Sequence, residues 1–229
     1  MAKTRTPAEE QATKEALFLV GARAFLRDGY GATSMKTLAE EAGCTTGKFY
    51  SNFSGKQEIL SMLMETLLRK NSDEAVRYAK KSGDVIMGMT VFFDLIYRGS
   101  ALYDNLREIY CEGLKPENSG AIAEQMLFKI REAVVENASL NDVDADMLYA
   151  YRCIIGALSN MLINLSILPE ERREEVFLVN ILCMLGLSKE EAGRYLQLVK
   201  KEDSRIRDKA YDVMVKLLEG RRRRTQSPV

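Results

Sequence analysis

The chain has 229 residues, 46% of them apolar, and its 33 lysine and arginine residues are matched by 33 aspartate and glutamate residues. With only 4 prolines and long stretches of good helix formers, this composition predicts an all-α protein with a sizeable core. The 4 cysteines are far apart and histidine is absent, which argues against a metal centre, and no cofactor is expected.

Nothing in the sequence indicates export or membrane insertion. The N-terminus has acidic residues before its short apolar run, unlike a signal peptide. There is no run of about 18 uncharged apolar residues, so no membrane span is expected. Scattered thiols suit a reducing compartment, and we therefore expect a cytoplasmic location.

Three helices are predicted near the N-terminus. Pro7 suits the first turn of a helix that runs to Asp28. Ser34 and Thr45 are of the residue types that cap helix starts. They predict a second helix over residues 35–42 and a third over residues 46–53. Because Thr37, rather than an acid, follows Ser34 by three positions, the capping box of the second helix is expected to be incomplete.

A long fourth helix is predicted from Lys56 to Lys81, with Gly83 at its end. The charge balance changes there, since residues 1–81 hold 13 Lys/Arg and 10 Asp/Glu, whereas residues 82–220 hold 16 and 23. Beyond this point the pattern stays helical, without strand alternation or repeats. The expected helices cover residues 84–100 and 101–114 (two helices or one kinked helix), 116–137, 142–168, 170–187, 189–201 and 203–220.

The segment from Ala42 to Lys56 mixes glycine, threonine and aromatic residues, a combination that a buried core does not need. Two short helices joined by a tight glycine turn are typical of a helix-turn-helix, whose second helix enters the major groove of DNA. Thr45 can cap that helix and donate to a phosphate, and Gly47 lets the backbone come close to DNA. The alternative is a helical hairpin with an incidental turn.

The longer stretch from Phe25 to Leu60 carries a pattern of aromatic, glycine, hydroxyl and aliphatic residues at fixed spacing. Its residues are Phe25, Gly29, Tyr30, Thr33, Ser34, Leu38, Ala39, Ala42, Gly43, Thr45, Gly47, Phe49, Tyr50, Phe53, Lys56 and Leu60. In this order and spacing the stretch resembles the DNA-binding domain of the TetR family of transcriptional regulators. Cys44 departs from the usual valine, and Asn52 stands where histidine or tyrosine is common.

The resemblance implies roles for individual residues. Phe25, Leu38, Phe49 and Phe53 are expected in the core of the three-helix unit. Contacts to DNA phosphates are expected from Ser34, Lys36, Thr45, Tyr50 and Lys56, and the residues nearest the bases are expected to be Thr46, Gly47, Lys48 and Ser51. Lys3 and Arg5 can form an arm on the backbone or in the minor groove.

The resemblance also implies domains. They are a DNA-binding domain at residues 1–55, a connecting helix at 56–82, a helical domain at 83–220 that binds an effector and dimerises, and a basic tail at 221–229. Aromatic and thioether residues in the helical domain at 83–220 suit an apolar ligand pocket, although each of them can instead be an ordinary residue of the hydrophobic core. The candidate ligand-binding residues are Phe92, Phe93, Tyr97, Tyr110, Met126 and Tyr149.

Two further features of the C-terminal half have two interpretations each. Small residues in the helix at 142–168 allow another helix to pack closely against it. One interpretation is that this helix and the next form half of a four-helix dimer interface, and the other is that it is a core helix of its own chain. The candidate interface residues are Ile154, Ala157, Met161 and Phe177. The apolar stripe at 203–220 is expected to pack on the body or on a partner chain, and Arg221–Arg224 is either a solvated tail or a nonspecific DNA contact.

No phosphate loop, nucleophile–base pair or metal cluster is recognisable, so an enzyme is not expected. The function predicted is that of a ligand-responsive regulator, a repressor that binds a palindromic operator in double-stranded DNA as a homodimer. A largely apolar small-molecule effector would release it. The alternatives are an all-helical adaptor for protein interactions and an effector-independent DNA-binding protein.

Overall fold

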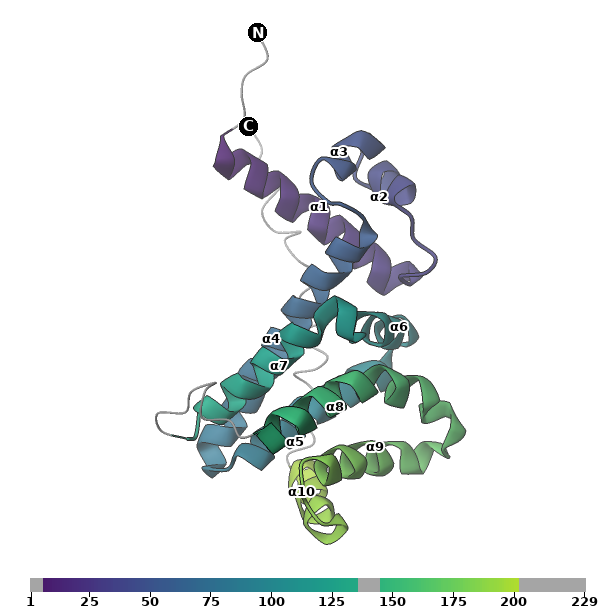
Figure 1. The fold of residues 1–229 in the computed structure, drawn as a ribbon. Helices are drawn as coiled ribbons and strands as arrows, with labels where there is room; N and C mark the ends of the chain where they lie inside the picture. The colour runs from purple at the N-terminus through teal and green to yellow at the C-terminus, as the bar shows by residue number, and fades with distance from the viewer. Residues whose placement is uncertain (1–5, 136–144, 202–229) are drawn as a thin grey trace.

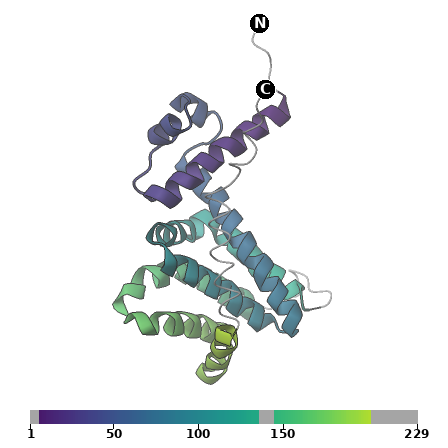
Figure 2. The same cartoon turned by 180° about the vertical axis from the view of Figure 1, so that it is seen from behind.

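The computed structural model describes residues 6–135 and 145–201. Within these ranges the chain is helical and contains no strand, which confirms the predicted all-α class. A small group of helices, here called the head, lies at one end of the long helix α4, and the larger body surrounds its other end (Figures 1 and 2). The predictions for Lys3, Arg5, the stripe at 203–220 and the tail at 221–229 lie outside the described residues.

The head consists of α1 (Pro7–Asp28), α2 (Met35–Glu41) and α3 (Thr46–Tyr50). The bounds of α1 agree with the prediction, whereas α3 is shorter than predicted. The prediction of an incomplete capping box on α2 is wrong, because the Thr37 hydroxyl replaces the missing acid. Thr37 Oγ1 accepts from the Ser34 N–H at 2.9 Å, and Ser34 Oγ accepts from the Thr37 N–H at 3.2 Å.

Four aromatic and aliphatic side chains fill the head, as predicted: Phe25, Leu38, Phe49 and Phe53 are each at most 1% exposed. The helix α4 (Lys56–Ser82) closes this core from below, and α1 crosses it closely. A Cβ on Gly21 would lie 2.8 Å from the Ile59 side chain, so glycine allows this approach. The head is therefore fixed on the first turns of α4.

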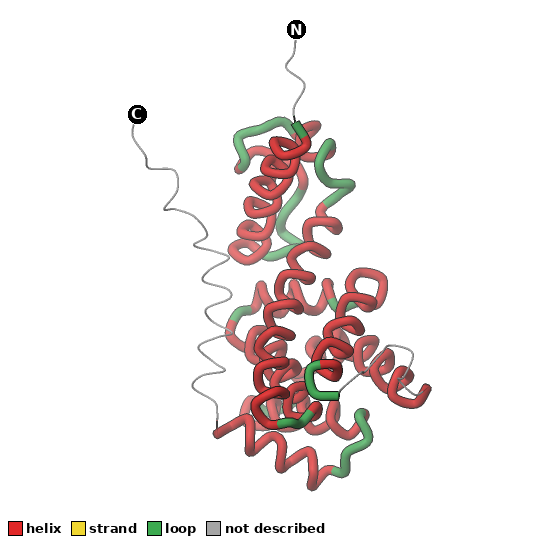
Figure 3. Tube along the Cα trace, turned by 90° about the vertical axis from the view of Figure 1, so that its left-hand side faces the viewer, coloured by secondary structure: helices red, strands yellow, loops and turns green. Residues whose placement is uncertain are grey.

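The body is built from α5 (Val85–Leu102), α6 (Asp104–Gly113), α7 (Pro116–Glu132), α8 (Ala145–Ile163), α9 (Glu170–Met184) and α10 (Lys189–Lys201), with a 3₁₀ turn at Asn164–Ile167 after α8. Loops between them are short in the tube view of the described chain (Figure 3). Gly83, with φ of 67°, ends α4 in the left-handed conformation. The extended backbone of Tyr103 separates α5 from α6, so the predicted alternatives resolve into two helices.

Two helices are long and apolar enough to span a membrane by length and composition, namely α5 and the stretch 145–167. Of the residues of α5, 72% are buried, and Arg98 Nε donates to Asp94 at 2.6 Å within this helix. The helix α5 is therefore the central helix of the body. In the second stretch only 39% of the residues are buried, and its exposed side chains include the apolar Tyr149, Ile163 and Ile167 beside polar ones such as Arg152 and Asn160.

Polar contacts attach α9 and α10 to α5. Arg98 also donates to Glu174 on α9 at 2.7 Å, and Lys200 on α10 lies 3.6 Å from the same carboxylate. The Tyr195 hydroxyl on α10 donates to Asp84 at 2.6 Å, and partial burial together with this carboxylate raises the Tyr195 pKa to about 12. The last described helix is thus fixed to the start of α5.

Candidate nucleic-acid interface

The turn between α2 and α3 depends on Gly43, whose φ of 62° is in the left-handed region. It is followed by Thr45, whose Oγ1 accepts from the Lys48 N–H at 3.2 Å and so caps α3 as predicted. Because this bond uses the hydroxyl only as an acceptor, its hydrogen is available to a phosphate oxygen. The side chain is exposed.

Most of the predicted DNA-binding residues lie on the outer surface of α2 and α3. Tyr50 is 55% exposed although it is a large aromatic residue. A Cβ added to Gly47 would have Thr45 Oγ1, at 3.9 Å, as its nearest atom, so packing within the chain does not require glycine at this position. Exposed members of the set are Ser34, Lys36, Thr45, Gly47, Tyr50 and Ser51, and Thr46 and Lys48 are partly exposed.

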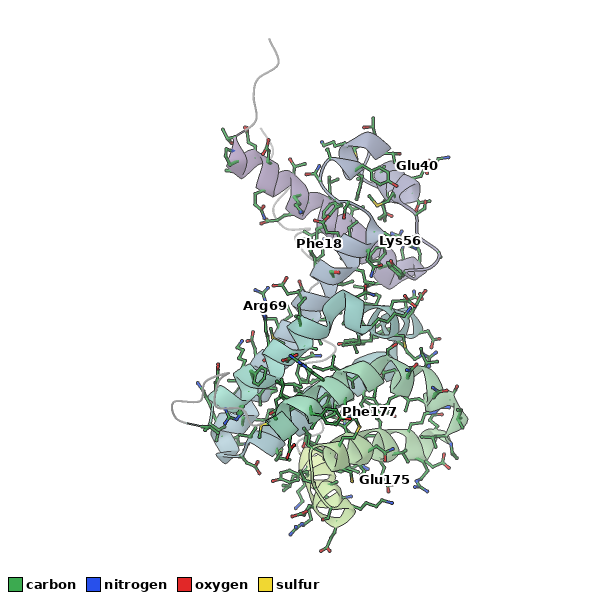
Figure 4. All side chains as sticks on the ribbon, in the orientation of Figure 1. Phe18, Glu40, Lys56, Arg69, Glu175 and Phe177 are labelled. Carbon is green, nitrogen blue, oxygen red and sulfur yellow. The ribbon has the colours of Figure 1, made fainter. Side chains whose placement is uncertain are left out.

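Lys56 has a structural role that the sequence did not reveal. Its ammonium donates to the carbonyl oxygens of Tyr30 at 3.0 Å and Thr33 at 3.2 Å, and it lies 4.2 Å from the centre of the Tyr30 ring. Figure 4 shows Lys56 at the base of the head, whereas Glu40 projects from α2 on its upper side. Lys56 therefore supports the loop before α2, and one of its three donors is left for a phosphate.

A polar clamp connects α6 of the body to the head. Glu108 accepts from the backbone N–H groups of Tyr30 at 3.0 Å and Gly31 at 2.8 Å, one on each carboxylate oxygen. Asn105 Nδ2 donates to the carbonyls of Leu26 at 3.1 Å and Arg27 at 2.8 Å, at the end of α1. A Cβ on Gly31 would lie 2.9 Å from Glu108 Oε1, so glycine leaves room for the carboxylate.

The body contains a cavity of about 590 Å³ between the start of α5, the end of α7, the first half of α8 and the end of α9. Its wall is mainly apolar and includes the three methionines Met89, Met147 and Met184. Tyr151 forms part of its inner side and is 1% exposed. Among the described residues that line it, Arg131 and Asp146 are charged. This volume is within the range of about 300–1,000 Å³ for small-molecule sites.

The six predicted ligand-binding residues do not line this cavity. Phe92 and Phe93 are at most 1% exposed and belong to the core. Tyr110 is also buried, with Asn71 Nδ2 donating to its hydroxyl at 3.2 Å, and burial raises its pKa to about 12. Tyr97 and Met126 pack at the edge of the core, and Tyr149 is 72% exposed.

The four predicted interface residues divide in a similar way. Ile154 and Phe177 are at most 1% exposed and pack inside their own chain. Ala157 and Met161 are partly exposed on α8. The most exposed large apolar side chains of this region lie elsewhere on the same helix and just after it, at Tyr149, Ile163 and Ile167, which are 72%, 54% and 77% exposed.

Comparison with known proteins agrees with this geometry. Residues 17–63 match the model of a family described as bacterial regulatory proteins, tetR family. Residues 17–63 therefore form a DNA-binding domain of the TetR-family type. The match covers α1 from Leu17, the helix-turn-helix and the first turns of α4.

Two curated proteins that resemble this chain are from Pseudomonas putida. The chain is 31% identical over 81 residues to the HTH-type transcriptional regulator TtgR, covering 35% of this chain and 38% of TtgR. It is 35% identical over 63 residues to the probable HTH-type transcriptional regulator ArpR, covering 28% of this chain and 30% of ArpR. The matched region thus spans less than two fifths of either relative.

A solved structure described as a gamma-butyrolactone receptor (ArpA-like protein) aligns with 83% of this chain and 98% of its own length. The TM-score is 0.33 and the sequence identity 16%.

Proposed function

We propose that the protein is a transcriptional repressor that binds a palindromic operator as a homodimer and releases it when a small molecule binds the body. The observation that carries the DNA-binding part is Gly47, which is exposed and not required by any neighbour in the chain. A glycine of this kind is explained by close approach of a partner. Exposed hydroxyls and lysines around it supply donors for phosphates and bases.

Exposed apolar side chains on α8 and just after it support dimerisation. Outward residues on α8 recur every three to four positions, from Tyr149 through Cys153, Gly156 and Asn160 to Ile163. Tyr149 and Ile163 are the exposed large apolar side chains on this face, Cys153 and Gly156 are partly exposed, and Asn160 is polar. Large apolar side chains gathered on one exposed face are typical of an interface. Pairing of this face about a two-fold axis would present two recognition helices to successive major grooves, as a palindromic operator requires.

The polar clamp gives the body a route to the head. Because Glu108 and Asn105 hold the end of α1 and the loop that follows it, a shift of α6 would displace the whole head. On its other side, α6 is tied to α8 through the Ser159 hydroxyl, which donates to the Cys111 carbonyl at 2.6 Å. An effector that favours one position of α6 would thereby change operator affinity.

DNA selection tests this proposal against the two alternatives. Full-length protein would be incubated with a random pool of duplexes, and retained duplexes sequenced. The proposal expects inverted repeats, with Gly47→Ala losing their retention. An adaptor would retain no duplex, and an effector-independent, nonspecific binder would retain all sequences equally, and either result would overturn the proposal.

A further inference from the structure

The charges of the body cavity restrict the chemistry of its ligand. Arg131 lies in the last turn of α7 and Asp146 in the first turn of α8, so the two side chains come from different walls. Among the described residues, neither side chain forms a hydrogen bond or ion pair with the other or with a third residue. One donor group and one acceptor group therefore line the cavity without a protein partner in the described part of the chain.

The opposite signs of these two groups disfavour a ligand with a net charge. A carboxylate on the ligand would be attracted by Arg131 and repelled by Asp146, whereas an ammonium would be attracted by Asp146 and repelled by Arg131. Asp146 is exposed and Arg131 partly exposed, so both groups lie at the mouth of the cavity. For a charged ligand the attraction by one group is offset by repulsion from the other, and the rest of the wall is largely apolar and does not favour a charge. A neutral head group that accepts from one side and donates to the other would satisfy both.

The apolar wall indicates what accompanies that head group. Met89, Met147 and Met184 bring three flexible thioethers to one cavity, and such side chains adapt to apolar ligands of irregular shape. The Tyr151 hydroxyl lies 3.9 Å from the Met89 sulfur at the inner side. A chain or ring system would fill this part, with the polar head at the charged pair.

We propose that the cavity binds a neutral amphiphile: a largely apolar body with one head group that carries a hydrogen-bond acceptor beside a donor, as a secondary amide does. The head group's carbonyl accepts from Arg131, and its N–H donates to Asp146. The proposed function is needed only for the consequence of binding, which is release of the operator, and not for binding itself.

Calorimetry with three probes of equal chain length tests the ligand class. N-methyldecanamide, decanoate and decyltrimethylammonium would each be titrated, below micelle-forming concentrations, into the full-length protein without DNA. We expect the amide to bind at least about tenfold more tightly than either charged probe, which is the worth of one charge-assisted hydrogen bond. Equal or tighter binding of a charged probe, or saturable binding of none, would overturn the proposal.

Charge variants test the two named groups. Asp146→Asn, at an exposed position, removes the like charge and should bring decanoate to within a few-fold of the amide. Arg131→Gln should weaken the amide and decanoate alike by about tenfold. Unchanged affinities in both variants would place the probe outside this cavity.

Filling the cavity gives an independent control. Ala150→Phe occupies the space and should abolish amide binding, whereas Ala121→Phe, on an exposed position of α7, should not. Equal amide affinity in both would contradict the assignment, and the charge variants decide it if Ala150→Phe fails to fold. If the amide binds the wild type but leaves an operator complex intact, the cavity inference stands and effector release is the part that fails.

Discussion

Removal of the Glu108 carboxylate should uncouple the head from the body without unfolding either. In Glu108→Ala the N–H groups of Tyr30 and Gly31 lose their acceptor, while the head core around Phe25 and Phe49 is untouched. A hydrogen bond to a charged group contributes about 1.5–3 kcal/mol when buried. Since Glu108 is only partly buried and water can reach Gly31, we expect about 1–3 kcal/mol for the two bonds together.

Hydrogen exchange at these two amides measures the effect directly. A loss of 1–3 kcal/mol in local stability corresponds to roughly 5- to 150-fold faster exchange. The effect should be confined to the clamp, so amides in the middle of α1 should keep their rates. Arg107→Ala on the same helix is the matched control, because its side chain pairs with Asp104 rather than with the head.

A double-mutant cycle with Gly31→Ala separates the clamp from general disturbance. The added Cβ would lie 2.9 Å from Glu108 Oε1 and displace the carboxylate, and the backbone at Gly31 is not in the left-handed region. Gly31→Ala should therefore resemble Glu108→Ala, and the pair together should be no worse than either alone. Wild-type exchange rates in Glu108→Ala, or fully additive effects in the pair, would refute the clamp.

Four further predictions follow from the described contacts. Gly47→Ala should keep or raise the melting temperature, with a gain of up to about 1 kcal/mol in the free energy of unfolding, yet it should lose operator binding. Gly193→Ala, at an equally open position in α10, should leave operator binding intact. Retained operator binding by Gly47→Ala would contradict a close approach of DNA to this residue. Lys56→Met should destabilise the head by about 1–2 kcal/mol in urea unfolding, because two loop carbonyls lose their donor, and an unchanged midpoint would show the contacts to be unimportant. Ile163→Glu should yield helical monomers in sedimentation, whereas Ile154→Glu should lose helical structure; an intact Ile163→Glu dimer would place the interface elsewhere. The Tyr195 pKa of about 12 in the folded protein exceeds the unfolded value of about 10. The stability that the protonated Tyr195 hydroxyl contributes is therefore full below pH 10 and is lost as pH rises toward 12. Tyr195→Phe should show a shallower loss of stability across that interval, and a profile identical to that of the wild type would contradict this prediction.

The sequence predicted those features that depend on local signals. Pro7, Gly83 and Thr45 mark helix ends through their own backbone and side-chain chemistry, and the structure places helix ends at each. The head core was predictable from the family pattern, and Phe25 and Phe53 are buried as expected. Thr37 shows the limit of such rules, since a hydroxyl completes the capping box where an acid was thought necessary.

Contacts between distant segments were beyond reach. Glu108 meets Tyr30 across 78 positions, and no pattern around either residue indicates the pair. The cavity combines Met89, Arg131 and Met184 from three helices, whereas the predicted ligand-binding residues lie outside its lining, some in the core and Tyr149 on the surface. On α8, which is apolar on most sides, composition could not tell the inward Ile154 from the outward Ile163.

Sequencing of the duplexes that full-length protein retains from a random pool is the most direct test of the proposed function. A homodimer that reads DNA through α3 predicts enrichment of two similar half-sites in inverted orientation. Their enrichment should disappear in Gly47→Ala while the protein remains folded. Retention without sequence preference, or enrichment that Gly47→Ala leaves unchanged, would contradict the assignment of this surface to operator recognition.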